Sequence, residues 1–114
     1  MKNPLLDFSQ YLLSNLIELG IKYPIIVGTD SDMKVEFDIT NLGVEFSGQT
    51  IRQIINDFLS EKYPNRFIRN NRMSRTPDII VFDDLNSNEI FLQIILTRII
   101  KEGKVWLAIR ATYF

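Results

Sequence analysis

Residues 33–39 carry the pattern that most strongly constrains the fold of this chain. Apolar and charged residues alternate without a break in the run MKVEFDI. Because successive residues of a strand point to opposite faces, the run predicts a strand with one apolar face and one charged face. Residues 23–27 are also rich in β-branched side chains, and the sequence GTDSD at 28–32 between the two runs is typical of a turn. The two runs therefore predict a β-hairpin.

Residues 4–19 have the spacing and the end signals of a helix. Asn3 suits the N-cap, Pro4 suits the first helical position, and Gly20 suits the residue just past the end. The apolar arc of this helix is wider than one sheet face usually needs. Two interpretations follow: the helix packs on two sides within the monomer, or it also lines a dimer interface.

A second helix is predicted by a start signal followed by a periodic apolar stripe. Thr50 and Gln53 match the capping-box pattern, in which each side chain bonds the other residue's backbone N–H. Apolar residues then recur at helical spacing as far as Tyr63, and Pro64 ends the helix because proline disfavours a helical residue before it. Between the hairpin and this helix, Val44 to Phe46 are interpreted as a short strand.

The second half of the chain contains three β-rich stretches. Asp78 to Phe82 is apolar on both faces, which predicts a central strand. Residues 89–101 fit two templates, because their polar residues fall every four positions and suit either one helix stripe or one strand face. Five isoleucines and a threonine favour a strand, turning at Gly103 into another strand over 105–113. A helix that ends at Gly103 is the alternative.

These elements predict one α+β domain over residues 1–114. Two helices pack on a mainly antiparallel sheet of five or six short strands. The 46% hydrophobic content is typical of a packed domain rather than a disordered chain. No secretory signal is visible, and the most apolar run is too short to span a bilayer. We therefore expect a cytoplasmic protein that does not enter membranes.

The chain contains neither cysteine nor histidine. Disulfides and thiolate metal sites are thereby excluded, together with the commonest metal ligand and the usual general base near neutral pH. The sequence also lacks the glycine-rich loops that bind phosphates and the Gly-x-Ser-x-Gly motif of serine hydrolases. We therefore expect no catalytic residues, no resident metal and no cofactor. The composition favours a protein that is not an enzyme, and an enzyme built only from Asp, Arg, Lys and Tyr is the alternative.

The most unusual feature is a basic segment at residues 62–76. It holds Lys62 and four arginines spaced three residues apart, with no acid, whereas the remainder of the chain has eight basic and fourteen acidic residues. Guanidinium groups match phosphate and carboxylate geometry and stay charged at any working pH. Residues three apart share one side of a polyproline-like strand or short helix, but they alternate sides on a β-strand.

Two interpretations of this segment stay open. In the first, it binds an anionic partner, either an acidic protein surface or nucleic acid, through Lys62, Arg66, Phe67, Arg69, Arg72 and Arg75. In the second, its arginines pair with the protein's own acids, such as Asp57, Glu61 and Asp83. Phe67 and Tyr63 interleave with the arginines, and their aromatic faces would suit stacking on unpaired bases.

Asp78 is a second candidate for function. Pro77-Asp78 precedes a predicted hairpin that reaches Gln93-Ile94-Ile95, and in outline this resembles the core of restriction-endonuclease-like nucleases of the PD-(D/E)xK type. The resemblance implies that Asp78 would be a Mg²⁺ ligand, with Glu45 as an accessory acid. Gln93 stands where the family has an acid and Ile95 where it has lysine, so the resemblance extends only to a degenerate relative.

The turn Asp30-Ser31-Asp32, with Asp83-Asp84 as a companion, is the third candidate. Paired carboxylates can bind Ca²⁺ or Mg²⁺, but Asp and Ser are ordinary turn residues and the EF-hand spacing is absent. A turn is the favoured interpretation.

The sequence therefore predicts a small non-catalytic interaction or regulatory protein that meets an anionic partner through residues 62–76 and self-associates. Sequence-independent nucleic-acid binding is the alternative, followed by a degenerate metal-dependent nuclease-like domain.

Overall fold

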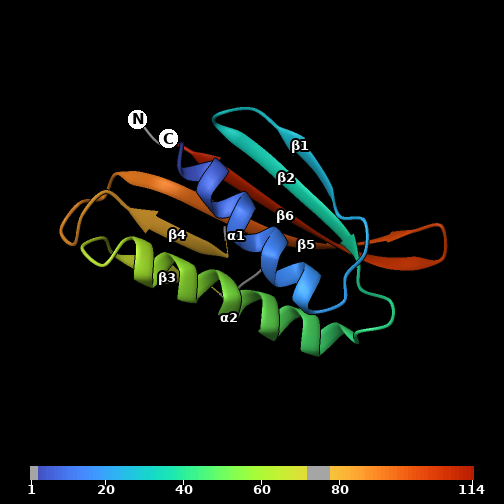
Figure 1. The fold of residues 1–114 in the computed structure, drawn as a ribbon. Coiled ribbons are helices and arrows are strands. Elements are labelled where there is room, and N and C mark those ends of the chain that lie inside the picture. Colours follow the sequence, from blue (N-terminus) through green and yellow to red (C-terminus); the bar gives the residue numbers. More distant parts are fainter. Residues whose placement is uncertain (1–2, 72–77) are drawn as a thin grey trace.

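Both helices lie on the same face of one antiparallel sheet (Figure 1). The structure is a computed structural model that describes residues 3–71 and 78–114, without the side chains of residues 44–47. Within these ranges the elements are α1 (Pro4–Glu18), β1 (Ile25–Gly28), β2 (Asp32–Asp38), α2 (Val44–Lys62), β3 (Ile68–Asn70), β4 (Ile79–Phe82), β5 (Ile90–Lys101) and β6 (Lys104–Tyr113). The strands lie in the order β1-β2-β6-β5-β4-β3. The predicted α+β fold is confirmed.

Helix α1 begins and ends where its local signals predict. The Asn3 side chain accepts a hydrogen bond from the Leu5 backbone N–H at 2.8 Å. At the other end, Gly20 has φ +83°, a conformation that costs glycine little, and the Ile21 N–H bonds back to the Leu16 carbonyl at 3.0 Å. The helix buries its stripe of Leu5, Phe8, Leu12 and Leu16.

Helix α2 is longer than the sequence predicts. It spans Val44–Lys62, so the short strand at 44–46 is wrong, and Thr50 lies inside the helix instead of capping it. Three apolar or charged residues are too few for periodicity to separate a strand from a helical turn. The helix follows directly on Gly43 at φ +80° and continues through Gly48.

Two hairpins form most of the sheet. The predicted β1–β2 hairpin is confirmed, with Gly28 opposite Met33. Residues 90–101 form a strand that pairs with β6 from Leu92↔Tyr113 to Lys101↔Lys104, which decides the ambiguity in favour of a hairpin. Its turn places Glu102 and Gly103 at φ 54° and 75°, the left-handed conformations that match the twist of tight hairpins. The predicted strand at 78–82 is β4, which lies between β3 and β5.

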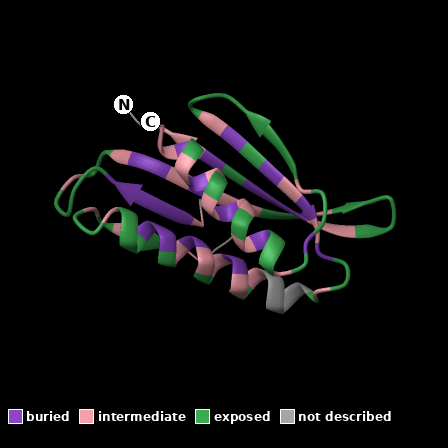
Figure 2. Ribbon diagram, viewed as in Figure 1, coloured by how far each residue is buried: buried purple, intermediate pink, exposed green. Residues whose placement is uncertain are grey.

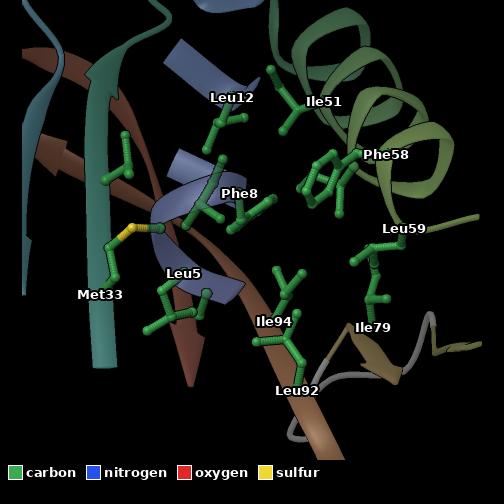
Figure 3. Close-up of a cluster of buried hydrophobic side chains, with 14 of the residues drawn as sticks. Leu5, Phe8, Leu12, Met33, Ile51, Phe58, Leu59, Ile79, Leu92 and Ile94 are labelled. Carbon is green, nitrogen blue, oxygen red and sulfur yellow. The ribbon is translucent and has the colours of Figure 1, made fainter. Parts of the chain in front are cut away.

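The core fills the space between the helices and the sheet (Figure 3). The stripe of α1 meets the apolar face of β2, where Val35 and Phe37 are fully buried. Ile51, Ile55, Phe58 and Leu59 of α2 complete the layer with Ile79 and Val81 of β4 and Leu92 and Ile94 of β5. Purple residues alternate with pink or green ones along β2 in Figure 2, as its sequence pattern predicts.

The opposite face of the sheet has no helix packed on it (Figure 1). The cross-strand register places Lys34, Arg110 and Ile95 together on this face. Neither helix in the described ranges combines the length and apolar character that a membrane span requires. We call this surface the helix-free face.

Candidate functional site: the helix-free face and its basic edge

The first two cations of the basic segment are engaged within the molecule. Lys62, in the last turn of α2, lies 3.2 Å from an Asp7 carboxylate oxygen on α1. Arg66 donates to the Asp83 carbonyl at 2.7 Å and lies 3.3 Å from that residue's carboxylate. Its guanidinium also stacks over the Phe91 ring at 3.8 Å. The predicted internal pairing with Asp83 is therefore present, and both cations lie on the helix side of the sheet.

Arg69 points to the other side of the sheet. Its neighbour Asn70 exchanges hydrogen bonds of 2.9 and 3.0 Å with the Asn56 side chain of α2, so Asn70 faces the helices. Because side chains alternate along a strand, Arg69 lies on the helix-free face, opposite Ile80 of β4. Its guanidinium lies 5.3 Å from the Phe82 ring centroid, within cation–π range. In the described ranges Arg69 forms no ion pair.

Phe67 completes a small aromatic and cationic cluster with Arg69. Its ring lies 5.7 Å from that of Phe82 and is tilted by 37°. Phe82 is buried, whereas Phe67 is 44% exposed, so Phe67 presents an apolar surface beside the Arg69 guanidinium. Arg72 and Arg75 lie outside the described residues. In the described part of the segment, strand β3 divides the side chains between two faces, so Lys62 and Arg66 do not form one stripe with Arg69.

The remaining charges of the helix-free face come mostly from β2, β5 and β6. The strand register places five cations and three carboxylates on this face in the described residues: Lys34, Arg69, Lys101, Lys104 and Arg110, with Asp32, Glu36 and Asp38. The face is therefore net positive, although the whole chain carries a formal charge of −1. The sequence prediction missed this face because its cations are dispersed over four strands instead of clustered in one segment.

The carboxylates of this face are paired with neighbouring cations. Arg110 holds Asp32 through two hydrogen bonds of 3.1 and 2.6 Å, and this pairing lowers the pKa of Asp32 and raises that of Arg110. A hydrogen bond from Lys34, 3.0 Å away, lowers the pKa of Glu36, and Lys101 lies 3.6 Å from the same carboxylate. Arg69, at the far edge of the sheet, has no such acidic neighbour in the described residues.

The register places Ile80, Gln93 and Thr112 between Arg69 and Asp32, and a group of apolar side chains lies further along β5 and β6. Ile95 of β5 faces Arg110 of β6, and Ile99 faces Trp106. Ile95, Ile99 and Trp106 are all partly exposed. The Lys101 ammonium lies 4.8 Å from the Trp106 ring, which orders another cation at the border of the apolar area. A signal for this arrangement exists in the sequence, since Lys104, Trp106 and Arg110 share one face of the alternating run at 104–112.

Asp78 is held by protein groups on both of its carboxylate oxygens. Oδ1 is paired with the Arg52 guanidinium of α2, and Oδ2 accepts a hydrogen bond from the Leu96 backbone N–H at 2.7 Å. In the described ranges no group of three acidic side chains is placed to hold a metal ion. The side chain of Glu45 is not described. Arg52, which the sequence pattern places on an exposed helix face, is the residue that engages Asp78.

The acidic turn at residues 30–32 is accounted for by the hairpin and its neighbours. Asp30 and Ser31 make the turn between β1 and β2, where the Thr29 N–H bonds the Asp32 carbonyl at 2.7 Å. The carboxylate of Asp32 is bound by Arg110. These contacts match the favoured interpretation of the run as a turn.

Comparisons with protein-family models, with curated proteins and with solved structures found no match to this chain.

Proposed function

We propose that this protein is a non-catalytic interaction protein that binds an acidic protein partner on the helix-free face, with Arg69 as the main anchor. The observation that carries the proposal is the Arg69 guanidinium, which forms no ion pair with the described residues and lies beside the exposed Phe67 ring. An arginine already stacked on Phe82 loses little conformational freedom when it binds a carboxylate, and it offers a bidentate donor fork.

The composition of the face supports a protein partner in preference to nucleic acid. Protein interfaces are enriched in aromatic residues and arginine, and this face carries Phe67 and Arg69 at one edge and Ile95, Ile99 and Trp106 further along β5 and β6. A nucleic-acid backbone would also meet Asp32 and Glu36 on the same face. An acidic protein surface can place its carboxylates at Arg69 and its neutral groups over the paired region.

The proposal extends the predicted role of the basic segment. Among its described residues, Lys62 and Arg66 are already paired with Asp7 and Asp83, so they are expected to contribute less than Arg69. Breaking such a pair to engage a partner replaces one ion pair by another, and the net gain is small. Arg69 has no pair to lose within the described residues.

The test compares Arg69→Ser with the matched control Arg98→Ser. Arg98 is exposed on β5, and the strand alternation places it on the opposite face from Ile99. Partners captured from extracts of the producing cells by the wild-type protein are identified and purified, and their dissociation constants are then measured for all three proteins. We expect Arg69→Ser to weaken binding by about tenfold, which corresponds to about 1.4 kcal/mol, and Arg98→Ser to leave it unchanged.

A parallel measurement uses a fluorescently labelled single-stranded oligonucleotide. If the partner is an acidic protein, the oligonucleotide should bind weakly, with an affinity that does not depend on Arg69. Tight binding whose affinity falls steeply with salt and depends on Arg69 would replace the protein partner by nucleic acid. Equal losses in Arg69→Ser and Arg98→Ser would show that net charge, not this site, determines binding, and would overturn the proposal.

A further inference from the structure

The two edges of the sheet are protected very differently. Edge strand β3 is three residues long, carries Arg69 and is tied to α2 through Asn70. Edge strand β1 consists of Ile25, Ile26, Val27 and Gly28, all of them exposed, with no charge and no proline inside the strand. Natural sheets usually protect an open edge with charges, proline or a bulge, because its free N–H and C=O groups otherwise pair with another chain.

Exposed apolar side chains are concentrated at this edge. In the described ranges ten large hydrophobic residues are exposed, and four of them, Tyr23, Ile25, Ile26 and Val27, fall within five consecutive positions. Tyr23 is 88% exposed and has φ 56°, which turns the chain into the strand. Such a concentration marks an interaction surface more strongly than exposed residues scattered singly.

The hydrogen bonds of the β1–β2 hairpin determine which groups of β1 point outward. Thr29 donates to the Asp32 carbonyl, so Thr29 and Asp32 form a hydrogen-bonded pair. Such pairs alternate along an antiparallel ladder, which makes Val27↔Lys34 and Ile25↔Glu36 the next hydrogen-bonded pairs. The N–H and C=O groups of Ile26 and Gly28 therefore point away from the sheet.

From this pattern we infer that two copies of the chain associate through antiparallel pairing of β1 with β1 about a twofold axis at Ile26. In this register the two Ile26 residues exchange both of their hydrogen bonds, and each Gly28 N–H reaches the Pro24 carbonyl of the second copy. Pro24 has no N–H, so it cannot donate to the facing Gly28 carbonyl, which stays exposed to water. Ile25 of one copy then lies beside Val27 of the other.

The charges that flank β1 also favour a second copy of the chain as the strand that pairs with it. The exposed Lys22 precedes the strand, and the exposed Asp30 follows it. Antiparallel self-pairing brings the basic end of one β1 beside the acidic end of the other, twice over. A twofold contact of this kind is self-complementary and closes after two subunits.

The small area of the β1–β1 contact determines the expected affinity of one copy for the other. Its exposed side chains cover far less than the roughly 800 Å² per partner of a standard protein interface. The dimer is therefore expected to form at high protein concentration and to dissociate on dilution. Because β1 and Arg69 lie at opposite edges of the sheet, the inference is independent of the proposed partner site.

The first experiment measures mass against concentration by sedimentation velocity. We expect the wild type to shift from 13.3 kDa toward twice that mass as concentration rises. Ile26→Lys places two like charges against each other at the twofold axis and is expected to weaken self-association by at least about tenfold. Ile100→Lys, at a residue 82% exposed on β5, makes the same chemical change elsewhere and is expected to leave it intact.

The second experiment tests the register. The chain has no cysteine, so Ile26→Cys introduces a single thiol. Directly hydrogen-bonded antiparallel partners have Cα atoms about 5.5 Å apart, within the range that a disulfide spans. We expect Ile26→Cys to form a cross-linked dimer under mild oxidation much faster than Ile100→Cys. A charge exchange adds a further check: Lys22→Glu weakens self-association, and adding Asp30→Lys restores it.

Three results would overturn the inference. One is a wild type that stays monomeric at every concentration. Another is a dimer that resists Ile26→Lys, which would assign self-association to a different surface. The third is an equal cross-linking rate for Ile26→Cys and Ile100→Cys. A monomer that instead loses binding of a partner protein on Ile26→Lys would show that β1 pairs with a foreign strand and not with a second copy.

Discussion

Replacing Asp78 by alanine should reduce the stability of the fold. The substitution leaves the partly buried Leu96 N–H without its acceptor and removes the partner of the Arg52 guanidinium. Losing a hydrogen bond to a charged acceptor costs about 1.5 to 3 kcal/mol. The ion pair adds less than about 1 kcal/mol, because the Arg52 side chain is 32% exposed. We expect Asp78→Ala to lower the free energy of unfolding by about 2 to 3 kcal/mol.

Urea unfolding followed by circular dichroism measures this loss. With an m-value of about 1.5 kcal/mol/M, the midpoint should fall by roughly 1.3 to 2 M. Asp78→Asn keeps an oxygen for the Leu96 N–H and loses only the ion pair, so its cost should be near 1 kcal/mol, as should that of Arg52→Gln. The Arg52→Gln/Asp78→Asn double variant should cost less than the sum of the two, since both remove the same contact.

The matched control is Asp57→Ala, which removes an exposed carboxylate from α2 that accepts a hydrogen bond from Gln53. Its effect should stay within about 0.5 kcal/mol. An Asp78→Ala variant as stable as the wild type would refute a structural role for this carboxylate. A gain in stability would do so more strongly, because relief of repulsion on removing an acid is typical of a carboxylate cluster that holds a metal.

Three further predictions concern the turns and the helix-free face. A Cβ at Gly28 would lie 2.5 Å from the Asp32 carbonyl oxygen, so Gly28→Ala should lower the free energy of unfolding, measured in urea, by about 1 to 3 kcal/mol. A Cβ at Gly48 in α2 would meet open space, so Gly48→Ala should raise the free energy of unfolding by up to about 1 kcal/mol. Glu102 has φ 54°, so Glu102→Gly should raise the melting temperature by relieving left-handed strain. The hydrogen bond from Arg110 lowers the pKa of Asp32 in the folded protein. The stability that this ion pair adds is therefore present above about pH 4 and is lost as the pH falls further. Below pH 4 the melting temperature of Asp32→Asn should fall less steeply than that of the wild type.

Several elements follow from local sequence because their causes are local. Asn3 caps α1 through its own side chain, and Gly20 ends the helix because a left-handed residue there costs glycine little. The alternation at 33–39 directs Val35 and Phe37 into the core in any fold that covers one face of the strand. These features need only neighbouring residues, so the sequence by itself determines them.

The ambiguous elements depended on partners far away in the chain. Residues 90–101 fit a helix or a strand, and pairing with β6 along nearly the whole strand makes them a strand. Tertiary packing overrides weak local preference at such positions.

The candidate site shows the same division. The sequence by itself determined that residues 62–76 are basic, since charge is a property of composition. Only the tertiary structure decided that Arg66 is neutralised by Asp83, that Asp78 is held by Arg52 across 26 positions, and that Arg69 faces away from the helices. Strand alternation fixes the side of each residue, but which side is covered depends on where the helices pack, and no residue within the segment specifies that.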